Sequence, residues 1–186
     1  SITLPASVIS IGTDAFLDCE NLEEIIVAEG NNSYSSVDGV LYDKNKTVLL
    51  KCPDKKSQVT IPSSVTTIEN GAFTSCHGLT SIEIPNSVKS ISSQAFFSCR
   101  NLTTVSIGNS VTAIGNGAFS NCTSLEEIIV AEENPSYSSV EGALYNKDQT
   151  VLSKWPDKKL NVSIPNSVTA IGNCAFEYCS ELTSIT

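Results

Sequence analysis

Hydrophobic and polar positions recur with a short period along most of the chain. In the copy that runs from Leu79 to Leu102, Ile82-Glu83-Ile84 alternates between apolar and polar, which is the spacing of a strand with one buried face. Ala95, Cys99 and Leu102 then follow at helical intervals. Each copy therefore predicts a strand, a corner, a second short extended piece and a short helix.

A cap-forming residue stands three positions before the phenylalanine of every copy. A short polar side chain at that place can accept a hydrogen bond from a free amide in the first turn of a helix. This pattern strengthens the prediction of a short helix around each phenylalanine. The five residues are Thr13, Asn70, Ser93, Asn116 and Asn173.

The inward strand positions follow one another by 23 residues, except at two places where the step is 34. A fixed period in this range is typical of a solenoid, in which small units stack because none can bury its apolar face alone. We expect eight rungs in one parallel sheet, within a single right-handed α/β solenoid that spans residues 1–186. The rung positions are Ile2, Ile25, Val59, Ile82, Val105, Ile128, Val162 and Ile185.

The two stretched coils replace the phenylalanine segment with another pattern. Asp38-Gly39 is a turn signal, and Val40–Tyr42 and Thr47–Leu50 are short strand-like runs separated by polar residues. The same pattern returns in residues 137–156, at an offset of 103 positions. We therefore expect two β-hairpins that project from the same side of the solenoid.

Phenylalanine and cysteine also recur at fixed places. Successive spacings of 57, 23, 23 and 57 from Phe16 to Phe176 predict one buried phenylalanine stack. Cysteines that share one phase form either a metal or disulfide array or a row of small buried hydrophobes. The sequence has no C-x-x-C cluster, so we expect reduced, shielded thiols. The row holds Cys19, Cys76, Cys99, Cys122 and Cys179, and Cys52 and Cys174 lie outside it.

Composition narrows the function classes. A formal net charge of −9 disfavours nonspecific binding to nucleic acid or to an anionic membrane. No apolar run approaches the ~20 residues of a membrane-spanning helix. The chain opens and closes inside a repeat, so we expect it to be a fragment of a longer array.

His77 is the only histidine, and it directly follows Cys76, as in a Cys–His catalytic pair. Cys76 is at a core position, whereas position 77 varies between copies like a solvated site. We expect no catalytic residue, no cofactor and no metal ligand. The residues equivalent to His77 are Glu20, Arg100, Thr123 and Ser180.

Charged residues leave two further alternatives open. Acidic pairs such as Glu126-Glu127 and Glu132-Glu133 flank a strand, whose geometry spreads carboxylates apart and favours a solvated face over a calcium site. Nine of the 11 Lys and Arg residues lie in the stretched coils. There they either protect hairpin edges from pairing with other sheets or form basic contact points for an acidic partner.

The repeated motifs resemble the BspA-like leucine-rich repeats of bacterial surface proteins. The motif P-x-S-V followed by A-F-x-x-C runs from Ile61-Pro62-Ser63-Ser64-Val65 to Cys76, and it returns from Ile84 to Cys99 and from Ile164 to Cys179. The copy that begins at Ile107 has Gly108 in place of the proline. The resemblance implies a leucine-rich-repeat solenoid on a secreted or surface-anchored protein. It also implies adhesion to host extracellular-matrix proteins, host cell-surface proteins or other cells.

We expect the outward strand positions to form the contact with a protein partner. Small hydroxyl residues dominate there and give a flat polar strip, which suits a broad contact better than a small molecule. Ile26 and Ile129 interrupt this strip beside glutamates, at the 103-residue offset. The predicted contact residues are Glu24, Ile26, Thr60, Glu83, Ser106, Glu127, Ile129 and Ser163.

Three functions compete at this point. The first is an extracellular binding or adhesion module, which the resemblance favours. The second is a structural spacer that displays other domains at the cell surface. The third is an enzyme, for which Cys76 and His77 are the only candidate residues.

Overall fold

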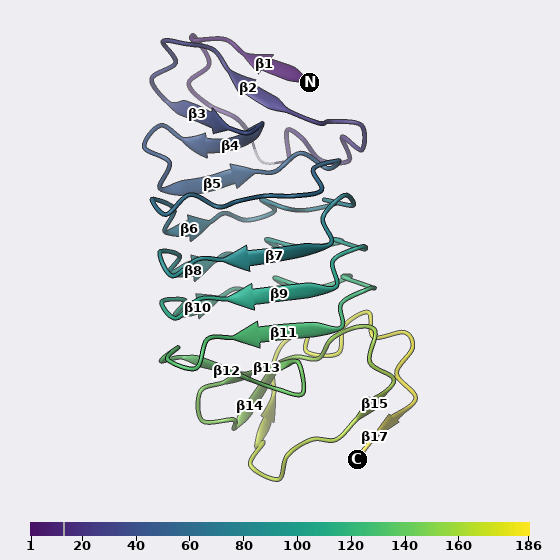
Figure 1. Cartoon of the computed structure of the whole chain (residues 1–186). Helices are drawn as coiled ribbons and strands as arrows, with labels where there is room; N and C mark the ends of the chain where they lie inside the picture. The colour runs from purple at the N-terminus through teal and green to yellow at the C-terminus, as the bar shows by residue number, and fades with distance from the viewer. Residues whose placement is uncertain (13) are drawn as a thin grey trace.

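The computed structural model describes residues 1–12 and 14–186, and it shows a stack of about eight coils. Figure 1 shows the rungs lying one above another, with the two chain ends at opposite ends of the stack. This confirms the solenoid that the 23-residue period predicts. Thr13, one of the five predicted cap residues, lies outside the described part.

One side of the stack carries parallel strands, which together we call the strand face. They confirm the predicted inward register, because Ile2 pairs with Ile25, and Ile82 with Val105 and then Ile128. The prediction of one continuous sheet is wrong, since residues 59–61 form no strand and the face divides into three sheets. These sheets are β1 (Ile2–Leu4) with β2 (Ile25–Val27), then β7 (Ser81–Ile84), β9 (Thr104–Ile107) and β11 (Glu127–Val130), and finally β15 (Asn161–Val162) with β17 (Ser184–Ile185).

The hairpin turns cause these breaks in the strand face. The Ile25 amide donates to the Gly39 carbonyl at 2.8 Å, and the Ile128 amide donates to the Gly142 carbonyl at 2.8 Å. Each turn therefore occupies the place where the next parallel rung would pair. Gly39 has a φ of +75°, which strains any other residue, and a Cβ there would lie 3.0–3.1 Å from atoms of Glu24, so Glu24 would have to shift.

The opposite wall contains both hairpins, and each is antiparallel as predicted. They do not project: β5 pairs in parallel with β6, so the first hairpin continues the wall. The Tyr137 hydroxyl accepts a hydrogen bond from the Ile114 amide at 2.9 Å and joins the second hairpin to it. The wall comprises β3 (Tyr34–Val37), β4 (Val40–Asp43), β5 (Val48–Lys51), β6 (Thr67–Ile68), β8 (Ser90–Ile91) and β10 (Ala113–Ile114), followed by β12 (Tyr137–Val140), β13 (Ala143–Asn146), β14 (Val151–Lys154) and β16 (Ala170–Ile171).

The predicted short helices are wrong, since none of the described residues lies in a helix. Each phenylalanine instead sits in a run of turns, which we call a Phe turn. The residues two positions before and after the phenylalanine have left-handed backbone angles, which interrupt a right-handed helix. The pairs are Asp14 and Asp18, Gly71 and Ser75, Gln94 and Ser98, Gly117 and Asn121, and Cys174 and Tyr178.

The amides of the Phe turns bond the next coil instead of closing helical turns. Phe73 donates to the Ala95 carbonyl at 2.7 Å, and Ser75 donates to the Phe97 carbonyl at 3.0 Å. The Asn70 side chain also reaches forward, to the Ser93 carbonyl at 2.8 Å, so it bridges two coils and caps no helix. The alternating amides thus form a ladder between successive Phe turns.

The phenylalanine stack holds three rings and not five. Phe73, Phe96 and Phe119 are fully buried and stack at centroid distances of 4.6 and 5.3 Å. Phe16 and Phe176 pack in separate clusters because a stretched coil lies between each of them and the central three. In the second stretched coil the Trp155 ring lies 6.4 Å from Phe176 and extends that smaller cluster.

Two buried asparagines tie the stretched coils to their neighbours. The Asn134 side-chain amide donates to the carbonyls of Gly108 and Val111, while its oxygen accepts from the amides of Ser136 and Tyr137, all at 2.8–3.0 Å. Asn31 makes the equivalent four bonds in the first stretched coil. Such fully satisfied buried amides fix the start of each hairpin.

Candidate partner-binding surface

The structure places most of the predicted contact residues outward on the strand face. Glu83, Ser106 and Ile129 are direct neighbours across β7, β9 and β11, so they form one continuous column. Ile26 and Ile129 are 41% and 43% exposed, which leaves much of each apolar side chain in solvent. Glu24, Glu83 and Glu127 are also exposed, and Ser106 is half-buried.

Thr60 and Ser163 are exposed but lie outside the strands, so the predicted set does not form one strip. The hairpin turns separate a patch around Ile26 from a patch around Ile129. Ile26 pairs with Thr3 and has exposed Glu23 and Glu24 nearby in sequence. The sequence pattern does not reveal this division, because the stretched coils keep the inward aliphatic positions of ordinary rungs on this face.

Two hollows lie beside these patches, where the sequence predicts a flat surface. One is lined by Glu83, Pro85, Ser106, Gly108 and Ile129. Gly108 replaces the repeat proline there because a Cβ would lie 2.7–2.9 Å from atoms of Asn86 and Ile84. The other hollow lies between Glu24 and Thr60. Both acidic and basic side chains line it, namely those of Glu23, Asp38, Lys55 and Lys56.

The cysteine row is buried in its central part. Cys76, Cys99 and Cys122 have no exposed surface, and all seven cysteines of the chain are free thiols. The Cys99 thiol donates to the Phe73 carbonyl at 3.0 Å, and the Cys122 thiol donates to the Phe96 carbonyl at 3.1 Å. These two thiols therefore bond the preceding Phe turn, whereas the Cys76 thiol donates to the Cys52 carbonyl of the stretched coil at 3.3 Å. Neither alanine nor valine can make such a bond.

Burial raises the pKa of the Cys76 and Cys99 thiols well above its usual value. Both thiols therefore stay protonated and unreactive at neutral pH. The Nδ1 atom of His77 is buried and has no hydrogen-bond partner among the described residues, so it is not seen to activate the Cys76 thiol. These observations favour a structural role for the pair.

We predict that a thiol reagent applied to the native protein labels Cys19, Cys174 and Cys179 before the other four cysteines, because these three are only half-buried. Cys179 reacts more slowly because burial raises its pKa to about 11. Cys52 belongs with the unreactive group, since it is fully buried in spite of its place outside the predicted row. Mass spectrometry of timed, quenched samples measures the order. Labelling of Cys99 at the rate of Cys174 would contradict the buried row.

Two hairpin lysines are not solvated edge residues. Lys51 lies 3.1 Å from Asp54, and Lys154 lies 2.5 Å from Asp157, with side chains that are at most 9% exposed. Each ammonium also donates to a carbonyl of the following Phe turn, at Thr74 and Glu177. Burial raises the pKa of both aspartates, and the paired lysine lowers it again in part. The solvated-edge interpretation is therefore wrong for Lys51 and Lys154.

Other hairpin lysines bond main-chain carbonyls on the surface. Lys44 donates to Asn31, Lys147 to Glu132 at 2.8 Å, and Lys159 to Glu141. These bonds occupy part of the basic surface that the sequence offers to an acidic partner. The strand face therefore remains the better candidate for a contact.

Within residues 1–12 and 14–186, no three His, Cys, Asp or Glu side chains come close enough together to hold a metal ion. In that same part of the chain, no helix is long and apolar enough to cross a membrane.

Comparison with known proteins identifies the repeat. The family model described as the BspA type leucine rich repeat region matches residues 1–40, 45–149 and 157–186, in 6 copies. No curated protein shows a significant match to the chain.

Two solved structures of bacterial proteins are similar over almost the whole chain. A leucine-rich repeat protein from Eubacterium ventriosum is 28% identical, with a TM-score of 0.65 over 99% of this chain and 47% of its own. A leucine rich cell surface protein from Faecalibacterium prausnitzii is 25% identical, with a TM-score of 0.66 over 98% of this chain and 59% of its own. The chain thus spans about half the length of these relatives. On its motifs, its coil geometry and these matches, the chain belongs to the BspA-type leucine-rich repeat family.

Proposed function

We propose that the chain is a non-catalytic, extracellular protein-binding or adhesion module within one solenoid domain that spans residues 1–186. The observation that carries the proposal is the pair of exposed isoleucines at equivalent places on the strand face. Isolated exposed apolar residues are common, but Ile26 and Ile129 recur 103 positions apart with glutamates beside both. A cell-surface protein is among the similar structures, which supports a secreted or surface-anchored location.

The two patches suit a weak contact that is strengthened by repetition. Each offers one apolar side chain with acidic neighbours, which is too little for a tight interface alone. Linked copies of a weak site raise the overall affinity without any new contact. We therefore propose host extracellular-matrix or cell-surface proteins as partners, since such surfaces present many copies of one binding partner.

We predict that changing Ile26 and Ile129 to Asp lowers the binding of protein-coated beads to immobilised matrix proteins by at least about tenfold. The charge removes the apolar anchor of both patches and adds to the acidic surroundings. Bead retention under flow, with collagen, fibronectin and laminin as separate surfaces, measures the effect. The matched control is Ile171→Asp, because Ile171 is 49% exposed but lies in β16 on the opposite wall.

Equal retention of the Ile26/Ile129 variant and the native protein would contradict this contact face. The structural spacer would instead be favoured by either of two results. In the first, neither the Ile26/Ile129 variant nor the Ile171 variant changes bead retention. In the second, the native protein is not retained on any of the three surfaces. Circular dichroism of each variant confirms that the solenoid is intact.

A further inference from the structure

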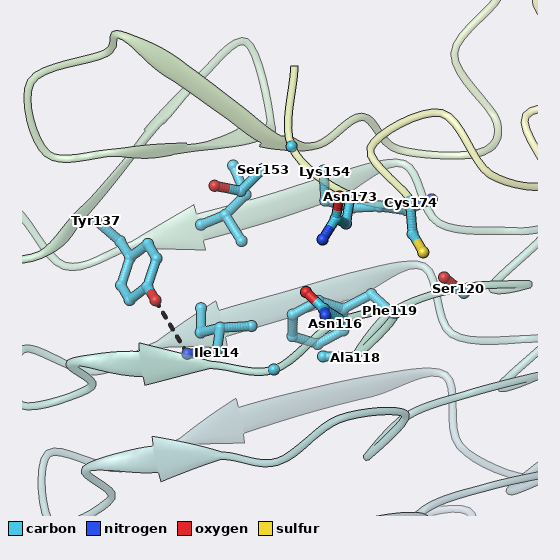
Figure 2. A pocket seen from close by; sticks show the side chains of 14 residues that line it. Ile114, Asn116, Ala118, Phe119, Ser120, Tyr137, Ser153, Lys154, Asn173 and Cys174 are labelled. Atoms are coloured by element: carbon cyan, nitrogen blue, oxygen red, sulfur yellow. Dashed lines mark hydrogen bonds between the residues drawn. The ribbon is translucent and has the colours of Figure 1, made fainter. Parts of the chain in front are cut away.

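The row of Phe turns is interrupted at each stretched coil, and each interruption leaves a cavity that we call a notch. The first notch lies between the Phe16 and Phe73 turns and measures about 350 Å³. The second lies between the Phe119 and Phe176 turns and measures about 160 Å³. Figure 2 shows the second notch, where Asn116 and Asn173 point toward each other from opposite walls.

Hydrogen-bond donors of the amide ladder end at these notches. The amides of Phe96 and Ser98 donate to carbonyls of the next Phe turn at 2.8 and 3.0 Å. The equivalent amides of Phe119 and Phe16, which line the second and the first notch, have no such partner among the described residues. The same holds for the amides of Asn121 and Asp18, which lie two residues further along the chain and outside the two linings. Each notch therefore has one unused donor in its lining and a second one two residues further along the chain, which is the spacing that an extended backbone accepts.

On the opposite side of each notch, the carbonyl acceptor already has a hydrogen-bond donor. The Thr74 carbonyl occupies the ladder position that accepts an amide in ordinary coils, and here the Lys51 ammonium donates to it at 2.8 Å. Lys154 does the same for the Glu177 carbonyl at 3.1 Å. Since only donors remain open, an occupant of the notch must supply carbonyl acceptors.

The second notch is narrowed and bridged by its own side chains. The Ser120 hydroxyl donates to the Glu177 carboxylate at 2.7 Å and bridges the two walls. Cys174 narrows the space further, where the first notch has Gly71. Outside it, the rings of Phe97 and Tyr178 meet edge to face at 6.2 Å.

The first notch lacks this bridge. Leu17 and Thr74 stand where the second notch has Ser120 and Glu177, and Leu17 is 48% exposed. Leu50 and Phe16 add apolar lining, and both are only half-buried. The first notch is therefore wider and offers apolar surface beside the unused donors.

Charge selects the type of occupant. Asp14 and Glu69 line the first notch and are exposed, whereas its one lysine, Lys51, is paired with Asp54. We propose that the first notch binds a short extended segment of a partner polypeptide. An apolar side chain of this segment lies against Phe16 and Leu50, its carbonyls accept from the Phe16 and Asp18 amides, and a basic residue faces Asp14 or Glu69.

The test uses a peptide that reproduces the missing turn. Residues 93–100 of the chain contain two phenylalanines and end at Arg100, so this segment has the required carbonyls, apolar side chain and positive charge. A fluorescein-labelled peptide of this sequence, with serine in place of Cys99, is titrated with the native protein and followed by anisotropy. We expect saturable binding at one site, with a Kd below about 1 mM.

Two reciprocal double variants use the second notch as the template. Leu17→Ser with Thr74→Glu introduces the bridge that spans the second notch, and it should weaken peptide binding at least about tenfold. Ser120→Leu with Glu177→Thr removes that bridge and should add a second site, seen as a higher stoichiometry. Changing Ile26 and Ile129 to Asp should leave peptide binding unchanged, which separates the notch from the strand-face contact.

Absence of saturable binding, or equal affinity in the Leu17/Thr74 variant, would overturn the proposal. Equal binding of a peptide with both phenylalanines changed to serine would overturn it as well. Thermal melts show whether each double variant is folded. If one of them unfolds, peptide binding by the other still tests the proposal.

Discussion

Replacing Phe96 by alanine should lower the free energy of unfolding by about 3–5 kcal/mol, because a buried aromatic ring leaves a cavity that its neighbours fill only in part. Phe96 is the middle ring of the stack, with Phe73 at 4.6 Å on one side and Phe119 at 5.3 Å on the other. Among residues 1–12 and 14–186, no other phenylalanine has a stacked aromatic partner on both sides. Urea denaturation followed by circular dichroism measures the change.

Phe97 provides the matched control for this experiment. It is the next residue, it undergoes the same chemical change, and it is only half-buried on the outer side of the Phe turn. Phe97→Ala should therefore cost less than half as much as Phe96→Ala. A loss below about 1 kcal/mol for Phe96→Ala would show that the stack is not a main source of stability.

The parallel register was predictable because it depends on period alone. Inward aliphatics at 23-residue steps place Ile82, Val105 and Ile128 in one column, and the structure pairs them in that order. The conformation of the Phe turns could not be predicted from spacing in the same way. Ala95 and Cys99 have helical spacing, but Gln94 and Ser98 adopt left-handed angles because their coil bonds the next coil. A tertiary ladder overrides a local propensity here.

The candidate surfaces were predictable only in part. The exposure of Ile26 and Ile129 follows from strand alternation, so the sequence places both correctly. The division of the strand face does not, because nothing in Asp38-Gly39 indicates that the turn lies beside Ile25. The 57-residue gaps between phenylalanines do signal the notches, but only once the Phe turns are known to form a ladder.

The buried lysines show how a repeat accommodates an inserted coil. A stretched coil has no Phe turn. A carbonyl in the Phe turn of the next coil therefore lacks the amide that would donate a hydrogen bond to it. Lys51 and Lys154 supply an ammonium donor to that carbonyl, and the adjacent aspartate balances the charge. Sequence alone does not separate these lysines from the surface lysines around them.

We predict that Lys154→Met lowers the free energy of unfolding by about 3–5 kcal/mol, because it leaves the buried Asp157 carboxylate without its partner. Asp157 lies 2.5 Å from the Lys154 ammonium, and its side chain is 1% exposed. Methionine keeps most of the apolar stem, so the loss reflects the charge and the bond to the Glu177 carbonyl. Replacing both partners, as Lys154→Met with Asp157→Leu, should recover much of the stability.

Lys158→Met is the matched control, since Lys158 and Glu181 form an ion pair at 3.2 Å in which both side chains are about half exposed. Exposed pairs contribute at most about 1 kcal/mol, so this variant should remain close to the native protein in urea denaturation. A loss for Lys154→Met no larger than that of Lys158→Met would contradict the role of the buried pair.

The pH dependence of the Lys154→Met variant gives a second and independent test. Burial raises the pKa of Asp157, and Lys154 opposes that rise, so the pKa increases further when the lysine is removed. The folded variant then binds a proton more tightly than the unfolded chain does. The contribution of Asp157 to the stability of the variant is therefore fully present below the unfolded pKa of about 4 and is lost as the pH rises through the folded value. The difference from the native protein should be smaller at about pH 4 than at about pH 7. An equal difference at both values would mean that Asp157 is not the group left unpaired.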